Sequence, residues 1–167
     1  MNLCGFIPES INEGKGVRAV LFISGCRHAC PGCFNKESWD FEAGEPFTNE
    51  LKTQILQEIA NNPLIDGVTL CGGDPFFSAE ECALFVSEFR ACCPDKNVWA
   101  YTGYTFEALM RQPKLRELAL MCDVIVDGRF NEQEKDTSLP FRGSRNQRIV
   151  DVALSVEKNC VIEVDLS

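Results

Sequence analysis

The segment Val17-Arg-Ala-Val-Leu-Phe-Ile-Ser24 runs directly into the loop Gly25-Cys-Arg-His-Ala-Cys-Pro-Gly-Cys-Phe-Asn35. The first segment alternates in polarity and is rich in residues that favour extended chain, so it predicts a β-strand. The loop then places Cys26, Cys30 and Cys33 within eight residues. Thiolates are the usual ligands of a cubic four-iron cluster, and three of them leave one iron open. The sequence therefore predicts an iron–sulfur site at the end of a strand.

A double glycine follows a second apolar segment, in Leu70-Cys-Gly-Gly-Asp-Pro75. Glycine has no Cβ, so the backbone at Gly72 and Gly73 can approach a ligand closely. An iron that no cysteine binds invites a small-molecule ligand, and the glycine turn offers a place for one. The two motifs together predict a cluster that binds S-adenosylmethionine.

The cysteine loop and the glycine turn together resemble the radical S-adenosylmethionine superfamily, whose members combine Cys-x3-Cys-x2-Cys with a Gly-Gly-Glu-Pro-like turn. The resemblance implies that Cys26, Cys30 and Cys33 ligate a [4Fe-4S] cluster and that S-adenosylmethionine chelates the open iron. Only 38 residues separate Cys33 from Gly72, which leaves no room for a second cluster domain, so one cluster is expected.

The same resemblance assigns a set of residues to the S-adenosylmethionine site. The backbone of the glycine turn is expected at the methionyl group, and Phe34 is the candidate to stack on adenine, since Gly32 stands where many relatives carry an aromatic residue. Asp74 replaces the usual glutamate of the turn. Thr102 and Tyr104 are added because they follow the third strand and could meet the ribose or methionyl end, with a core role as the alternative. The full set is Gly32, Phe34, Asn35, Gly72, Gly73, Asp74, Thr102 and Tyr104.

Motifs along nearly the whole chain narrow the resemblance to the activating proteins of anaerobic ribonucleoside-triphosphate reductase. These motifs are Glu13-Gly-Lys-Gly-Val-Arg18, Leu21-Phe-Ile-Ser-Gly-Cys26, Cys30-Pro-Gly-Cys-Phe-Asn35, Gly72-Gly-Asp-Pro75, Tyr101-Thr-Gly-Tyr104, Val126-Asp-Gly-Arg-Phe130 and Arg142-Gly-Ser-Arg-Asn-Gln-Arg148. The resemblance implies that the reduced cluster cleaves S-adenosylmethionine and that the resulting 5′-deoxyadenosyl radical takes a hydrogen from a glycine of the reductase. It also implies two partners, the reductase and a low-potential electron donor such as reduced flavodoxin.

Other functions remain open at this point. Cys26, Cys30, Cys33 and His28 could form a structural zinc site, Cys30-Pro-Gly-Cys33 could be a thiol redox pair, and the thiols could be inert core residues. We expect the His28 ring to point away from the cluster or merely to line it. A related activator of a different glycyl-radical enzyme, another small radical S-adenosylmethionine enzyme and a non-catalytic iron–sulfur or zinc module are the alternative functions.

The remaining pattern predicts alternating strands and helices. Helices are expected from Thr48 to about Ala60, from Ser78 to about Phe89, and over Thr105 to Met121 with a break at Pro113. Further strands are expected at 68–71, 97–101, 124–127 and 147–150. Such alternation is typical of parallel strands joined by helices, and the length allows about five or six βα units. We therefore expect one domain over residues 1–167, an incomplete, open-sided βα barrel of mostly parallel sheet.

Composition limits the partners and the compartment. With 25 acidic and 16 basic residues the formal charge is −9, which argues against nucleic-acid binding. No segment is apolar enough for a membrane span and no export signal is visible, so reduced thiols in the cytoplasm are the expected state of the ten cysteines.

Two further features are expected to lie outside the cluster. The adjacent Cys92 and Cys93 are expected to point in different directions. A basic group, consisting of Arg129, Arg142, Arg145 and Arg148, is expected either to bind the substrate carboxylate or the reductase, or to form surface ion pairs.

Overall fold

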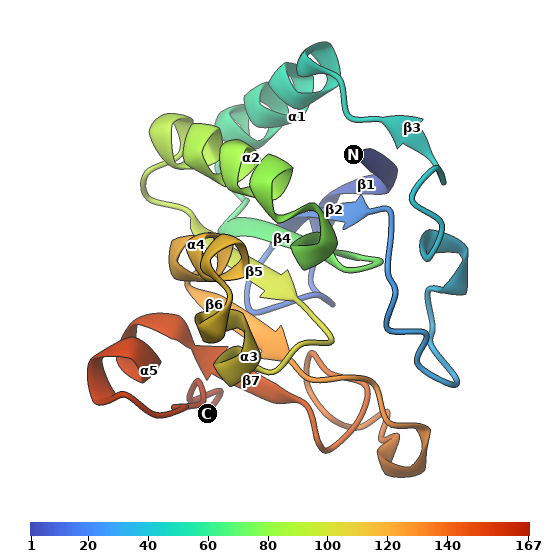
Figure 1. Cartoon of the computed structure of the whole chain (residues 1–167). Helices are drawn as coiled ribbons and strands as arrows, with labels where there is room; N and C mark the ends of the chain where they lie inside the picture. Colours follow the sequence, from blue (N-terminus) through green and yellow to red (C-terminus); the bar gives the residue numbers. More distant parts are fainter.

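The computed structural model describes residues 1–167 as a mixed α/β fold built on one seven-stranded sheet (Figure 1). The strands are β1 Asn2–Ser10, β2 Arg18–Ile23, β3 Glu45–Pro46, β4 Gly67–Gly72, β5 Asn97–Tyr101, β6 Val124–Asp127 and β7 Arg148–Asp151. Their order across the sheet is β3-β1-β2-β4-β5-β6-β7. Because β3 and β7 lie at the two edges and do not pair with each other, the sheet is open.

Two helices begin at the threonine caps that the sequence predicts, and a third begins at the predicted proline, whereas Ser78 precedes α2 without a capping hydrogen bond from its side chain. Thr48 and Thr105 accept hydrogen bonds from Leu51 N–H and Ala108 N–H through their hydroxyls, and Pro113 starts a new helix after a break. The helices are α1 Asn49–Asn61, α2 Ala79–Cys92, α3 Phe106–Arg111, α4 Pro113–Met121 and α5 Val152–Lys158, with short 3-10 turns η1 Lys36–Ser38, η2 Pro75–Ser78 and η3 Glu132–Glu134.

The four central strands β2, β4, β5 and β6 run parallel, and each connection between them includes a helix. The expectation of mostly parallel, alternating structure is confirmed for this part. The expected number of five or six βα units is too high, because a loop without an α-helix follows β6 and returns the chain as β7, antiparallel to β6. The first strand, β1, was not expected as a long element, and it pairs antiparallel with β2.

Two layers of side chains cover the faces of the sheet. One face packs against α1, α2 and α4 in a cluster of 29 buried residues, and Figure 1 shows these helices together on one side. The opposite face holds a smaller cluster around Trp99, Val126 and Ile149, covered by Phe141 and by the C-terminal tail. The contact between the sheet and these helices buries most of the apolar side chains, and this burial stabilises the fold.

A buried arginine fills the second face at the beginning of the parallel strands. Arg18 is fully buried, and its Nε donates to Thr69 Oγ1 at 2.6 Å while its Nη2 donates to Val68 O at 2.8 Å. Burial lowers the pKa of Arg18 to about 10.

The carboxyl ends of the parallel strands lead into the cysteine loop, the glycine turn and the loop after β6 (Figure 1). In parallel sheets this edge is the usual place for a binding site. No helix in the structure combines the length and apolar character needed to cross a membrane.

Candidate functional site

The cysteine loop leaves the end of β2 in a conformation that backbone contacts determine. Gly25 N–H donates to Ser38 O at 2.8 Å and Cys26 N–H donates to Trp39 O at 3.1 Å. Gly25 has a φ of +104°, and a Cβ there would collide with the ring of Phe41. Glycine is therefore required at the point where the strand turns into the loop.

Each of the three loop sulfurs is close to a backbone N–H group. Asn35 N–H donates to Cys33 Sγ at 3.4 Å, while the backbone of His28 contacts the Cys26 thiol and that of Phe130 contacts the Cys30 thiol. Burial raises the pKa of Cys26 to about 11 and also raises the pKa of Cys30. These half-buried thiols fit a cluster, because N–H groups directed at sulfur stabilise iron-bound thiolates.

His28 is engaged away from the cysteines. Its Nε2 lies 2.8 Å from Asp74 Oδ2, and its ring meets the Tyr104 ring edge-on at a centroid distance of 4.7 Å. No three His, Cys, Asp or Glu side chains converge on a single ion position. A cubic cluster needs no such point, because each thiolate binds a different iron. The structure therefore favours a cluster over a zinc site that uses His28.

The glycine turn packs directly against the start of the cysteine loop. Gly73 N–H donates to Ile23 O at 2.7 Å, and Asp74 N–H donates to Gly25 O at 2.9 Å. Gly72 has a φ of +104°, and a Cβ on Gly73 would lie 2.6 Å from Gly25 O. The two motifs, which lie far apart in the sequence, thus form one hydrogen-bonded unit.

The Asp74 carboxylate is fully occupied inside this unit. Asp74 is 1% exposed, and its Oδ1 accepts a hydrogen bond from Phe76 N–H at 2.9 Å. Its Oδ2 accepts from Thr102 Oγ1 and from Gly103 N–H, both at 2.9 Å. The Nε2 atom of His28 lies 2.8 Å from the same Oδ2. A carboxylate with four donors has little capacity left for another ligand. Asp74 therefore acts by holding the turn, which the sequence could not indicate.

A pocket of about 460 Å³ adjoins the two motifs. It brings together Phe34, Asn35, Gly72 and Gly73 from the predicted set, and Asn35 Nδ2 donates to Gly72 O at 3.3 Å. The other lining residues are Asn12, Glu13, Phe22, Cys71, Tyr101, Thr137, Leu139, Phe141, Arg142 and Gly143. The volume falls within the range of small-molecule sites.

Four residues of the predicted set lie outside this pocket, and one of them is the buried Asp74 described above. Gly32 packs against Glu132, so that a Cβ on it would lie 2.8 Å from the carboxylate. Thr102 is buried against Asp74, and Tyr104 packs against His28. The structure does not bring their side chains to the pocket wall.

Several further pocket residues were not part of the set that the sequence assigned to S-adenosylmethionine. Glu13 lies in the loop between β1 and β2, and Ser10 Oγ donates to its Oε2 at 2.5 Å. Tyr101 OH donates to Phe141 O at 2.7 Å. Arg142 donates from Nη1 to Gln147 O at 2.9 Å, but its buried Nε has no partner. Glu13, Tyr101 and Arg142 occur within the family-like motifs, which assign no role to Glu13 or Tyr101, whereas Arg142 belongs to the basic group expected to bind the substrate carboxylate or the reductase or to form surface ion pairs.

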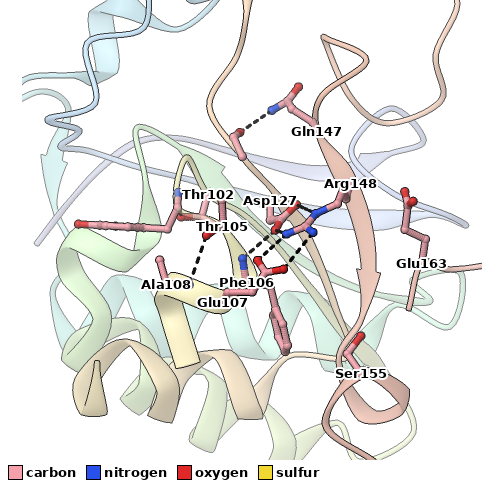
Figure 2. Close-up of polar contacts among 12 residues, drawn as sticks. Thr102, Thr105, Phe106, Glu107, Ala108, Asp127, Gln147, Arg148, Ser155 and Glu163 are labelled. Atoms are coloured by element: carbon pink, nitrogen blue, oxygen red, sulfur yellow. Dashed lines mark hydrogen bonds and ion pairs between the residues drawn. The ribbon is translucent and has the colours of Figure 1, made fainter. Parts of the chain in front are cut away.

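The arginines at the end of the chain separate into different roles, as Figure 2 shows in part. Arg148 donates from Nε to Asp127 Oδ1 at 3.1 Å and from Nη2 to Glu107 Oε2 at 2.7 Å, and the hydrogen bonds with Asp127 raise the pKa of Arg148. Asp127 Oδ2 also accepts from Phe106 N–H at 2.7 Å, so the pair joins the end of β6 to the first turn of α3 (Figure 2). Arg145 lies 3.8 Å from Asp136 at the surface. Arg129 is exposed, and only Arg142 reaches the pocket.

The expectation that Cys92 and Cys93 point apart is wrong. Their sulfurs lie 3.5 Å apart, because Cys93 has left the helix with φ −133° and ψ 62° and turns back towards its neighbour. Both line a cavity with Asn97, the first residue of β5, at the opposite end of the strands from the cysteine loop. They therefore do not belong to the candidate site. No two cysteine sulfurs are joined in a disulfide.

Comparison with known proteins agrees with this geometry. A family model described as a 4Fe-4S single cluster domain matches residues 12–150. The chain is 43% identical over 152 residues to the anaerobic ribonucleoside-triphosphate reductase-activating protein of Pasteurella multocida, an alignment that covers 89% of this chain and 96% of the relative. It is 38% identical to the Escherichia coli protein of the same name, with 88% and 96% covered, and 37% identical to that of Enterobacteria phage T4, with 89% and 93% covered.

Proposed function

The chain belongs to the family of anaerobic ribonucleoside-triphosphate reductase-activating proteins, and from this we propose that it reductively cleaves S-adenosylmethionine to generate a glycyl radical on the reductase. One observation carries the proposal. The cysteine loop and the glycine turn are hydrogen-bonded to each other beside a pocket of about 460 Å³. A ligand that must touch both an open iron and the glycine backbone requires such an arrangement.

The residues of the loop hold the cofactor in this proposal. Cys26, Cys30 and Cys33 bind three irons of one [4Fe-4S] cluster, and the nearby N–H groups stabilise their thiolates. When bound, the cluster and S-adenosylmethionine together supply one-electron cleavage of the sulfonium and hence the 5′-deoxyadenosyl radical. The protein's part is to orient the ligand and to exclude competing reactions.

The pocket accounts for recognition of S-adenosylmethionine. In this proposal the backbone of Gly72 and Gly73 would bind the methionyl group and Phe34 and Asn35 would border the adenosyl portion, which is supported by the presence of all four residues in the pocket lining. The unpartnered Nε of Arg142 is suited to a carboxylate, since a guanidinium donor in a pocket favours an anion. Asp74, Thr102 and Tyr104 act from behind the turn rather than on the ligand.

The proposal also includes the domain organisation, the partner proteins and the cellular compartment. We take residues 1–167 as one radical S-adenosylmethionine domain and its open sheet as the incomplete barrel of that superfamily. The reductase and a low-potential electron donor such as reduced flavodoxin are the proposed partners. Ten free thiols support a reducing compartment, the cytoplasm, as the place of action.

The test is anaerobic reconstitution with iron and sulfide, followed by reduction and addition of S-adenosylmethionine. We expect a changed electron paramagnetic resonance signal of the cluster and formation of 5′-deoxyadenosine and methionine. Cys30→Ala abolishes both, whereas the matched variant Cys160→Ala, at an exposed thiol far along the chain, changes neither. If S-adenosylmethionine leaves the cluster's electron paramagnetic resonance signal unchanged and no products form, or if the protein binds zinc tightly and forms no cluster, the protein is a non-catalytic module instead.

Activation of the partner is measured separately. Wild type mixed with the reductase and S-adenosylmethionine should produce the doublet signal of a glycyl radical on the reductase. Cleavage of S-adenosylmethionine without that signal would indicate a related activator with a different target.

A further inference from the structure

The cysteine loop has one hydrogen-bonded anchor between its first two cysteines. Arg27, His28 and Ala29 separate Cys26 from Cys30, and of these only His28 hydrogen-bonds to a residue outside the loop. The side chain of His28 is 5% exposed and that of Asp74 is 1% exposed. A polar pair buried to this degree has a defined geometry, because neither group can exchange its partner for water.

The backbone beside this anchor needs support. Ala29 has a φ of +51°, a left-handed conformation that side-chain-bearing residues rarely adopt. Such a residue keeps its conformation only when surrounding contacts hold it there. The hydrogen bond of the preceding His28 to Asp74 is the contact that the structure provides.

Asp74 connects the anchor to two neighbouring strand ends. Its own backbone lies in the glycine turn after β4, and its Oδ2 accepts from Thr102 Oγ1 and Gly103 N–H after β5. His28 adds the loop that follows β2. One carboxylate therefore joins the ends of three parallel strands at the candidate site.

The place of the imidazole ring is also shaped by its neighbours. Phe77 and Tyr104 pack against it at centroid distances of 5.1 and 4.7 Å. A Cβ on Gly103 would lie 2.5 Å from His28 Cδ2, so only glycine leaves room for the ring. The surroundings thus accommodate a histidine in one orientation.

We propose that His28 is a positioning residue, which through Asp74 holds Cys26 and Cys30 at a fixed separation from the glycine turn. The inference rests on the proposed function, in which S-adenosylmethionine spans the open iron and the glycine backbone. A ligand that bridges two segments binds well only if their separation is set before it arrives. A rigid link between the segments removes the entropy that binding would otherwise have to overcome.

The test compares full-length variants reconstituted anaerobically with iron and sulfide. His28→Phe keeps a ring between Phe77 and Tyr104 but removes the donor to Asp74, whereas His28→Gln keeps an N–H donor in a similar position. Lys36→Ala, at an exposed lysine that makes no hydrogen bond through its side chain, is the control. The measurements are the rate of iron loss to a chelator and the Kd for S-adenosylmethionine, read from the cluster's electron paramagnetic resonance signal.

We expect His28→Phe to lose iron at least roughly tenfold faster and to show a Kd at least roughly tenfold higher, since tenfold corresponds to the lower end of the range for one hydrogen bond to a charged group. His28→Gln restores most of both quantities, and Lys36→Ala matches wild type. Equal values for His28→Phe and wild type overturn the proposal. If the wild-type cluster forms but does not respond to S-adenosylmethionine, the proposed function fails, while iron retention in the variants still tests the positioning role.

A second measurement needs neither cluster nor ligand. Gly103→Ala places a methyl group against the His28 ring in the wild-type background, whereas a His28→Ala background removes the three ring atoms that lie nearest to that methyl group. We expect Gly103→Ala to lower the urea midpoint of the apoprotein in the first background and to leave it nearly unchanged in the second. Equal shifts in both backgrounds overturn the proposed contact even if His28→Phe does not fold.

Discussion

Replacing Gly73 by alanine tests whether the glycine turn and the cysteine loop form one packed unit. The new Cβ would lie 2.6 Å from Gly25 O and 2.7 Å from Ser38 O, whereas ordinary contacts begin at 3.4 Å. The backbone must therefore move by about 0.8 Å, since both neighbours are main-chain oxygens that cannot rotate away. The movement separates Asp74 N–H from Gly25 O, which are 2.9 Å apart.

The expected cost follows from these two effects. Overpacking by one methyl group costs about 1–3 kcal/mol, and loss of one backbone hydrogen bond costs about 1 kcal/mol. Gly73→Ala should therefore lower the free energy of unfolding by about 2–4 kcal/mol, a large part of the ~5–15 kcal/mol typical of a domain. The same displacement should weaken binding of S-adenosylmethionine in the reconstituted protein.

Urea unfolding of the apoprotein, with the m-value checked for constancy, measures this cost. Gly5→Ala is the matched control, because its Cβ meets only Phe22 at 3.8 Å and its φ is not positive. We expect that control to change stability by less than about 1 kcal/mol. If Gly73→Ala is as stable as Gly5→Ala, the two motifs are not packed as described.

Three further predictions concern other parts of the molecule. Asp127→Ala should lower the free energy of unfolding by about 3 kcal/mol, because Phe106 N–H loses its acceptor and Arg148 keeps only Glu107 as a partner. Thermal or urea unfolding measures this change. An unchanged free energy of unfolding contradicts the contact between β6 and α3. Arg142→Gln should raise the Kd for S-adenosylmethionine about tenfold, measured by isothermal titration of the reconstituted protein, and an unchanged Kd contradicts a role in binding. The same variant should lower the free energy of unfolding by about 1 kcal/mol, because it loses the contacts with Gln147 O and Glu163. Burial raises the pKa of Cys122 from 9.0 to about 12, so the folded state favours the neutral thiol. The free energy of unfolding should therefore fall as the pH rises from about 9 towards 12. Urea titrations at several pH values should show a shallower fall for Cys122→Ala than for the control Cys160→Ala.

Local features of the fold and of the site were predictable from the sequence. The helix starts at Thr48 and Thr105 and the break at Pro113 agree with the structure, because capping and proline chemistry act within one helical turn. The three-cysteine loop and the double glycine also fall at the predicted strand ends. Each of these features depends on residues that are close in the chain.

Features that depend on distant residues were not predictable. The alternation of strands and helices gave no sign that β7 would return antiparallel, since that direction follows from the loop after β6. The contact of Cys92 with Cys93 is an exception, because these neighbours were wrongly predicted although only the local backbone of Cys93 after α2 decides it. Arg142 and Arg148 belong to one basic segment, yet the first lines the pocket and the second pairs with Asp127.

Three thiols in one loop, a glycine turn without side chains and the family to which they point can all be read from neighbouring residues in the sequence. Only the tertiary structure decided that the Asp74 carboxylate faces inward to His28, Thr102 and Gly103, and that Glu13 and Arg142 share a pocket with the glycine turn. The physical reason is the range of the interactions. Ligand spacing and backbone freedom are properties of neighbouring residues, whereas the direction of a polar side chain depends on which donors and acceptors the folded sheet brings to it.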